Sequence, residues 1–238
     1  KQSYQKVKSE LGNEGMQEKL NLELQELEEL ERCLKDVAKH FKLGSDSTSP
    51  NGHIACLRLF DWFQTTTGNR TFNVEIALPA SLDSDESLGQ KQVRALELII
   101  RSLIDERYGG SQDELKEAME IVFGEEVVQE WLKNCDPDNL LSGTNFSLLA
   151  SIFCNREGFP HHQPIYEESD VLSYIKRNKR KTIQFFLDDI RRIRNRFAHN
   201  KDITLSQLEL LNIYYEELVA PIGQFHEHGH TKVNPNEF

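Results

Sequence analysis

The chain has 238 residues, a mass of 27.6 kDa and a formal net charge of −11 at pH 7. This length fits one large domain, or a smaller domain with an appended segment. With 38% hydrophobic and 28% charged residues, and few glycines (13) and prolines (7), the composition is that of a globular protein and excludes a collagen-like or disordered one. No uncharged apolar window reaches about 18 residues, which excludes a membrane-spanning helix.

Cysteine usage and the N-terminus bear on the cellular compartment. The four cysteines are widely spaced and form no C-x-x-C pair, which argues against a zinc ribbon or a thioredoxin-like site. Because no signal peptide opens the chain, we expect a reduced, cytoplasmic protein with no metal or cofactor. Since the chain starts at Lys1 rather than Met, we also expect it to be a piece of a longer protein. The acidic net charge argues against non-specific nucleic-acid binding, but not against a local basic site.

Residues 1–43 are predicted to form one long amphipathic helix. Its apolar residues follow an a/d track that Glu31 interrupts: Leu20, Leu24, Leu27, Leu34, Ala38 and Phe41. This track indicates packing or a short coiled coil, through which a regulatory domain or partner would act.

Residues 44–87 are predicted to be a linker followed by a small segment with one or two strands. The linker, residues 44–52, is rich in Gly and Ser. Apolar and polar residues alternate over 72–78, which is typical of a half-buried strand, and Pro79 ends it. Residues 56–60 fit either a partner strand or a helix that continues to Phe63, and the pattern leaves both open.

Residues 88–222 are predicted to form a bundle of four to five helices, so the expected fold class is mainly α. Apolar residues at helical spacing place helices over 88–108, 111–123, 127–132 and 145–153. A Gly/Pro loop then leads to a long helix over 169–199. A capping-box pattern from Thr204 to Gln207 begins a last helix over 205–222, and residues 223–238 are predicted to be a flexible tail.

The long helix combines an apolar stripe with a basic surface. The stripe recurs every three or four residues: Ile183, Phe186, Leu187, Ile190, Ile193 and Phe197. Asn195 and His199 are four residues apart and therefore share a face roughly opposite the stripe, while Arg194 sits at the edge of the stripe. Nine Lys or Arg residues lie within 175–200, opposed only by Asp188 and Asp189, so we expect an anion to bind here.

Residues 194–199, Arg-Asn-Arg-Phe-Ala-His, resemble the R-N-x-x-x-H motif of HEPN ribonucleases. With Asn200 the segment reads R-N-x-x-A-H-N, as in HEPN modules of RNA-surveillance endonucleases and of bacterial defence or toxin proteins. In that family the motif lies near the end of a long helix in a helical bundle with one more helix after it, which is the setting predicted over 88–222. A second R-x-x-x-x-H copy, from Arg156 to His161, falls in the Gly/Pro loop, and we interpret it as fortuitous.

The resemblance implies a metal-independent endoribonuclease for single-stranded RNA, of the antiviral defence or toxin type. In such enzymes the ribose 2′-hydroxyl attacks the neighbouring phosphate and leaves a 2′,3′-cyclic phosphate and a 5′-hydroxyl. His199 would move the proton, Arg194 would stabilise the negative phosphorane, and Asn195 would orient the phosphate or the imidazole. The resemblance also implies a homodimer whose two motifs face one cleft. The basic side chains expected to bind RNA are Lys176, Lys179, Arg180, Arg191, Arg192 and Arg196.

Two other functions fit the same residues. One is a non-catalytic HEPN-like bundle that dimerises or binds a nucleotide. The other is a coiled-coil adaptor whose basic helix docks an acidic partner. The sequence contains no P-loop, G-x-G-x-x-G, G-x-S-x-G or H-E-x-x-H pattern that would support nucleotide hydrolysis, dehydrogenation, esterase or zinc-protease chemistry.

Overall fold

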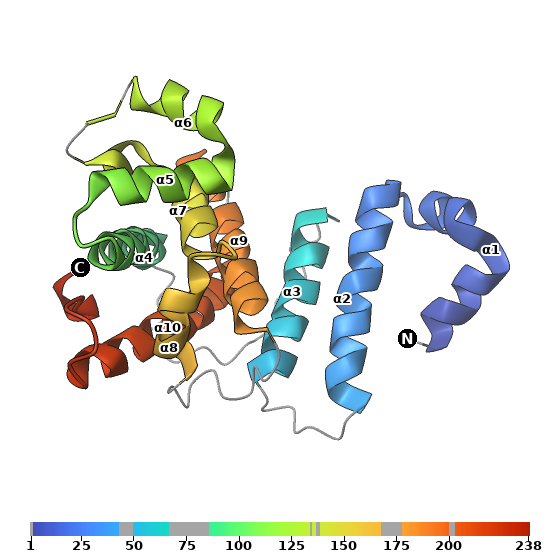
Figure 1. The fold of residues 1–238 in the computed structure, drawn as a ribbon. Helices are drawn as coiled ribbons and strands as arrows, with labels where there is room; N and C mark the ends of the chain where they lie inside the picture. The colour runs from blue at the N-terminus through green and yellow to red at the C-terminus, as the bar shows by residue number, and fades with distance from the viewer. Residues whose placement is uncertain are drawn as a thin grey trace. The chain divides into compact units, whose positions relative to one another are not determined.

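The computed structural model describes residues 2–42, 50–66, 86–133, 135–136, 139–167, 178–199 and 203–238. These residues form ten α-helices and two short 3-10 helices, with no β-strand among them (Figure 1). The mainly α fold class is therefore confirmed. None of the described helices combines the length and apolar character that a bilayer crossing requires. By its contacts the chain divides into two units, Lys1–Ser84 with Thr204–Leu210, and Asp85–Ile203 with Leu211–Phe238.

The first unit begins with two helices where the sequence predicts one. These are α1 (Gln2–Leu20) and α2 (Leu24–Lys42). Gly12 kinks α1 with a φ of 67°, and Asn21 ends it with a φ of 52°. Left-handed backbone cannot continue a right-handed helix, and glycine and asparagine are the residues that adopt it at least cost. The prediction of a single helix over 1–43 is wrong because apolar spacing does not register a local backbone reversal.

The core of the first unit lies between α2 and α3 (Pro50–Thr66), which run side by side (Figure 1). Leu30, Cys33 and Trp62 are buried together there. On α2, Leu27 is 1% exposed whereas Leu24 is 47% exposed, so the buried stripe differs from the predicted track. Part of the apolar surface that predicted a coiled coil is thus covered within the chain itself.

Helix α3 decides the alternative left open for residues 56–60. They lie inside this helix, which begins with Pro50 at its first position, where the missing N–H of proline costs nothing. The partner strand is therefore ruled out, and residues 50–52, predicted to be linker, are helical as well. The strand predicted over 72–78 lies outside the described residues.

The second unit is a helical bundle, as predicted. Side-chain caps on the first free N–H groups fix two of its helix starts: Ser111 accepts from the N–H of Glu114, and Asn145 from that of Leu148. Helix α8 was not predicted, because its two prolines and the preceding Gly158 indicate a loop. The elements of this unit are α4 (Glu86–Arg107), α5 (Gln112–Phe123), α6 (Glu125–Leu132), η1 (Leu140–Gly143), α7 (Phe146–Phe153), α8 (Phe159–Glu167), α9 (Lys179–Ala198), most of α10 (Leu205–Glu227), and η2 (Pro235–Glu237).

Helix α9 carries the residues of interest and packs against α4, α7 and α8. It begins at Lys179 rather than near residue 169, because Asn178 adopts a left-handed φ of 58° and caps the N–H of Lys181 at 3.2 Å. Residues 168–177 lie outside the described part. The predicted apolar stripe is confirmed, with these members buried: Ile183, Phe186, Leu187, Ile190 and Ile193. One face of α9 is thereby fixed in the core.

Helix α10 starts as predicted but ends later. Thr204 and Gln207 form the capping box, with reciprocal hydrogen bonds of 3.1 and 3.2 Å. The helix continues past Pro221 to Glu227. Glu106 of α4 then accepts hydrogen bonds from the Thr231 hydroxyl and, at 2.7 Å, from the N–H of residue 232. The prediction of a flexible tail over 223–238 is wrong, because polar composition does not reveal pairing with a distant carboxylate.

Candidate functional site

The R-N-x-x-x-H motif occupies the last turn of α9. Asn195 and His199 are exposed, and Arg194 is half-buried. His199 is the C-cap, and its backbone N–H donates to the carbonyl oxygens of Asn195 and Arg196, both at 3.2 Å. The motif is therefore held by the end of a regular helix, as the sequence predicts, and the negative end of the helix dipole lies at the imidazole.

A groove of about 450 Å³ runs between α4 and the end of α9. Arg194, Phe197 and Ala198 line it from α9. Phe197, predicted to be in the core stripe, is half-buried and forms part of this groove. The lining from α4 is Gln90, Val93, Arg94 and Glu97. The motif arginine thus faces a concave surface rather than open solvent.

The other two motif residues do not line this groove. Asn195 and His199 lie four residues apart on an exposed face of α9. Among the described residues neither side chain has a hydrogen bond, and Arg194 has no hydrogen bond or ion pair either. In a single chain the guanidinium and the imidazole therefore do not line one pocket.

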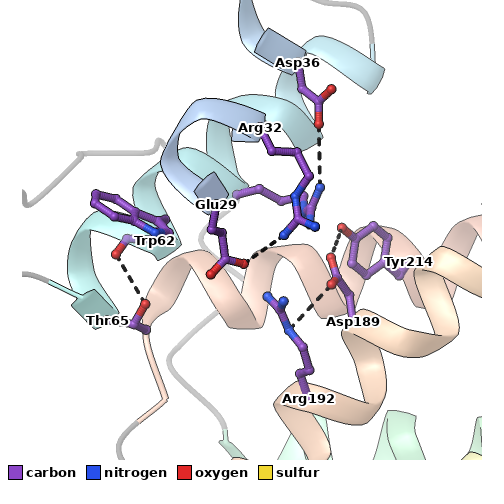
Figure 2. Close-up of polar contacts among 9 residues, drawn as sticks. Glu29, Arg32, Asp36, Trp62, Thr65, Asp189, Arg192 and Tyr214 are labelled. Carbon is purple, nitrogen blue, oxygen red and sulfur yellow. Dashed lines mark hydrogen bonds and ion pairs between the residues drawn. The ribbon is translucent and has the colours of Figure 1, made fainter. Parts of the chain in front are cut away.

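A buried carboxylate ties α9 to α10 about one and a half turns before the motif (Figure 2). Asp189 is 6% exposed and accepts a hydrogen bond of 2.9 Å from the Tyr214 hydroxyl. Its other oxygen lies 3.7 Å from Nε of Arg192. The ring of Phe186 stacks on Tyr214 with the centroids 4.5 Å apart. A buried hydrogen bond from a hydroxyl to a carboxylate is strong, so the Tyr214–Asp189 contact helps to hold α9 against α10.

Several basic residues predicted to bind RNA already have partners within the chain. Arg192 pairs with Asp189, and Nη2 of Arg191 lies 3.9 Å from Asp188 in an exposed pair. Arg196 is half-buried and also interacts within the chain, and Lys176 lies outside the described residues. Exposed pairs of this type are weak, so they lower the local positive charge without locking the arginines in place.

Lys179 and Arg180, at the start of α9, support other helices. Nζ of Lys179 donates to the carbonyl oxygen of Tyr166 at 2.5 Å, and Nη1 of Arg180 donates to that of Cys154 at 2.9 Å. These carbonyls lie near the C-terminal ends of α8 and α7, where backbone oxygens lack partners within the helix. Both side chains therefore have a structural role, whatever else they bind.

The second R-x-x-x-x-H copy has a different setting. His161 is exposed on α8, so the prediction that this copy falls in a loop is wrong for its histidine. The adjacent His162 is 4% exposed and stacks on Phe153. Burial, with the positive charge of Arg107 and His161 nearby, lowers the pKa of His162 to about 3. Its imidazole is thus neutral near pH 7 and unsuited to donating a proton there.

Cys154, which is buried in this unit, is not suited to act as a nucleophile. Burial raises the pKa of the Cys154 thiol to about 12, although Arg180 nearby acts in the opposite direction. A thiol with so high a pKa stays protonated at neutral pH, and the thiolate is the reactive form. The motif at the end of α9 is left as the stronger candidate for proton transfer.

Sequence reasoning missed the α4 side of the groove. Arg94 is exposed and has no hydrogen bond or ion pair among the described residues, while Glu97 pairs with Arg101 at 3.2 Å. Residues 90, 94, 97 and 101 follow helical spacing, so a polar stripe on this helix was visible in the sequence. Nothing in the sequence, however, indicates that this stripe packs beside residue 194.

Fold and motif together define a HEPN protein. A family model described as STY4199-like HEPN matches residues 1–235, and the chain belongs to this family. The resemblance drawn from residues 194–199 is thereby confirmed, and the match also covers the N-terminal helices, which lay outside the region assigned to it. HEPN domains are often ribonucleases and commonly dimerise. No curated protein and no solved structure matches the chain.

Proposed function

We propose that this protein is a metal-independent endoribonuclease that cuts single-stranded RNA at a site composed of two copies of the motif, one from each subunit of a homodimer. The observation that carries the proposal is the R-N-x-x-x-H motif on the last turn of α9, in a chain of the HEPN family. The histidine and asparagine are exposed, and the arginine faces a groove. All three are therefore accessible to a nucleic acid.

The chemistry assigns a role to each side chain. The 2′-oxygen of a ribose attacks the adjacent phosphorus, the bond from phosphorus to the 5′-oxygen breaks, and a 2′,3′-cyclic phosphate and a 5′-hydroxyl remain. One proton must leave the 2′-hydroxyl and one must reach the 5′-oxygen. Histidine suits both transfers near neutral pH, so His199 moves the protons. Arg194 stabilises the phosphorane charge through its planar fork, and Asn195 orients the phosphate or the imidazole.

A dimer supplies what one chain lacks. One His199 cannot be protonated and unprotonated at once, whereas two copies can act as proton acceptor and donor in the same turnover. The exposed face that carries Asn195 and His199 suits a symmetric pairing of two α9 ends. Two such motifs in one cleft would bring both imidazoles and both guanidiniums to one phosphodiester.

The test is cleavage of a labelled single-stranded RNA in the presence of EDTA. Wild type should cut the RNA and leave 2′,3′-cyclic phosphate ends, while Arg194→Ala and His199→Ala should each lower the rate by at least about 100-fold, the scale of a lost catalytic group. The second motif copy provides matched controls, since Arg156→Ala and His161→Ala change the same residue types and should cut normally. Equal losses in all four variants, or no cleavage by wild type, would reject the proposal.

A second function is favoured by one observation. Arg194 and His199 do not share a pocket in one chain, which also fits a non-catalytic HEPN module that dimerises or binds a nucleotide. A stable dimer without any RNA cleavage would support this alternative. A monomer that binds only an acidic protein would instead support an adaptor, although α2 uses much of its apolar face against α3.

We also propose that the ribonuclease acts as a defence or toxin effector under control of its N-terminal helices. A free ribonuclease would harm its host, so activity needs a restraint. In α1 and α2, Glu31 accepts hydrogen bonds from Tyr4, at 3.1 Å, and from Lys8. These contacts fold the first half of α1 onto α2. Glu31→Gln would weaken these contacts between α1 and α2. The proposal predicts that this variant cuts RNA at a different rate, although its R-N-x-x-x-H motif is intact.

A further inference from the structure

We propose that the groove between α4 and α9 binds one nucleotide unit of the RNA strand, with its phosphate held between Arg94 and Arg194. This inference rests on the proposed function for its ligand, and it adds a binding residue on a helix outside the motif. Arg94 comes from the middle of α4 and Arg194 from the end of α9, and both line the same concave surface. Two guanidinium side chains from two helices thus line one groove.

The charges of the groove favour an anion. Its charged lining consists of the two arginines and Glu97. Glu97 is already paired with Arg101 at 3.2 Å, whereas Arg94 and Arg194 have no hydrogen bond or ion pair among the described residues. The protein carries a formal net charge of −11, yet the lining of this groove has two arginines and one carboxylate. Guanidinium matches phosphate geometrically, through two parallel N–H donors.

The size and remaining lining fit a nucleotide rather than a bare phosphate. At about 450 Å³ the groove lies within the range of small-molecule sites, which is about 300–1,000 Å³. Val93 and Phe197 offer apolar surface to a sugar or base, and Gln90 offers an amide for hydrogen bonds to a base edge. The lining from α9 includes Ala198, the last residue of that helix, which directly precedes His199 in the chain.

Arg94 is exposed, so its replacement by alanine should leave α4 folded, since alanine is the better helix former. Lys91 provides a matched control. It is exposed on the same helix one turn earlier, carries the same charge, and does not line the groove. A general loss of positive charge would affect Arg94→Ala and Lys91→Ala equally, whereas a specific contact would affect only the first.

The test is binding of a short single-stranded RNA by fluorescence anisotropy, using the full chain with His199→Ala to prevent cleavage. Adding Arg94→Ala should weaken binding about tenfold, the loss expected for a charged hydrogen bond to phosphate, and lower the slope of log K against log salt by about 0.7. Lys91→Ala should stay within about twofold, with an unchanged slope. Arg94→Lys should restore the salt slope but not the full affinity, because lysine lacks the planar fork.

The results separate this inference from the proposed function. Equal effects of Arg94→Ala and Lys91→Ala, no effect of either, or no RNA binding by the His199→Ala parent would overturn the inference, even if wild type cleaves RNA. Conversely, a specific loss of binding in Arg94→Ala alongside an inactive wild type would support the groove and reject the ribonuclease. If wild type cleaves, Arg94→Ala should raise KM more than it lowers kcat, because it removes a contact made in both the ground and transition states.

Discussion

His162 makes the stability of the protein depend on pH in a predictable way. The side chain projects from α8, is 4% exposed and stacks on Phe153, with ring centroids 4.4 Å apart. Burial is the main reason why its pKa falls from 6.5 to about 3, and the positive charge of Arg107 and His161 adds to the effect. Folding therefore holds this imidazole in its neutral form.

The sign and size of the effect follow from proton linkage. Between pH 6.5 and 3 the unfolded chain binds a proton at residue 162 that the folded chain does not, so the free energy of unfolding rises with pH in this window. The contribution is present in full above pH 6.5 and is lost as the pH falls toward 3. The slope is about 1.4 kcal/mol per pH unit inside the window, which gives about 2 kcal/mol between pH 7 and pH 5.

Urea unfolding at pH 7 and pH 5 measures this contribution. The difference in free energy of unfolding between the two pH values should be about 2 kcal/mol smaller in His162→Phe than in wild type, because phenylalanine keeps the stacking but cannot bind a proton. His162→Leu, with a smaller apolar side chain, should show the same reduced pH dependence if the phenylalanine ring is too large for the site. His161→Gln, an exposed neighbour, should keep the pH dependence of wild type. An equal pH dependence in wild type and both His162 variants would refute a buried neutral imidazole.

Three further results are expected. Tyr214→Phe should lower the free energy of unfolding by about 1.5–3 kcal/mol in urea, because the Asp189 carboxylate loses a buried hydrogen bond; an unchanged stability would mean that the bond contributes nothing. Thr204→Ala should cost about 1 kcal/mol in the same assay by removing the cap of α10, and a loss near zero would argue against the capping box. After subunit exchange, an equal mixture of wild type and His199→Ala should keep about one quarter of the RNA cleavage of undiluted wild type if both imidazoles are needed, whereas one half would indicate that each chain acts alone.

The sequence predicted elements well where local patterns determine them. The stripe from Ile183 to Ile193 gave α9 its buried face, and the Thr204–Gln207 pattern gave the start of α10, because both signals lie within a few residues of each other. It failed where a single residue reverses the backbone. Gly12, Asn21 and Asn178 adopt left-handed φ values and break or begin helices that apolar spacing alone would extend.

The candidate site could be predicted only in part for a different reason. The motif is local, so its place at the end of a helix followed from periodicity. The groove is not local, because Arg94 and Arg194 line it from two packed helices about a hundred residues apart in sequence. Similarly, the last residues look like a polar tail until Glu106 is found as the partner of Thr231.

The central claim is tested most directly by the ends of the RNA product. The purified full chain is incubated with 5′-labelled single-stranded RNA in EDTA, and the 3′ ends of the products are analysed by mass spectrometry. The account predicts fragments that end in a 2′,3′-cyclic phosphate, formed by wild type and absent with His199→Ala. Intact RNA with wild type, or the same fragments from wild type and His199→Ala, would contradict it.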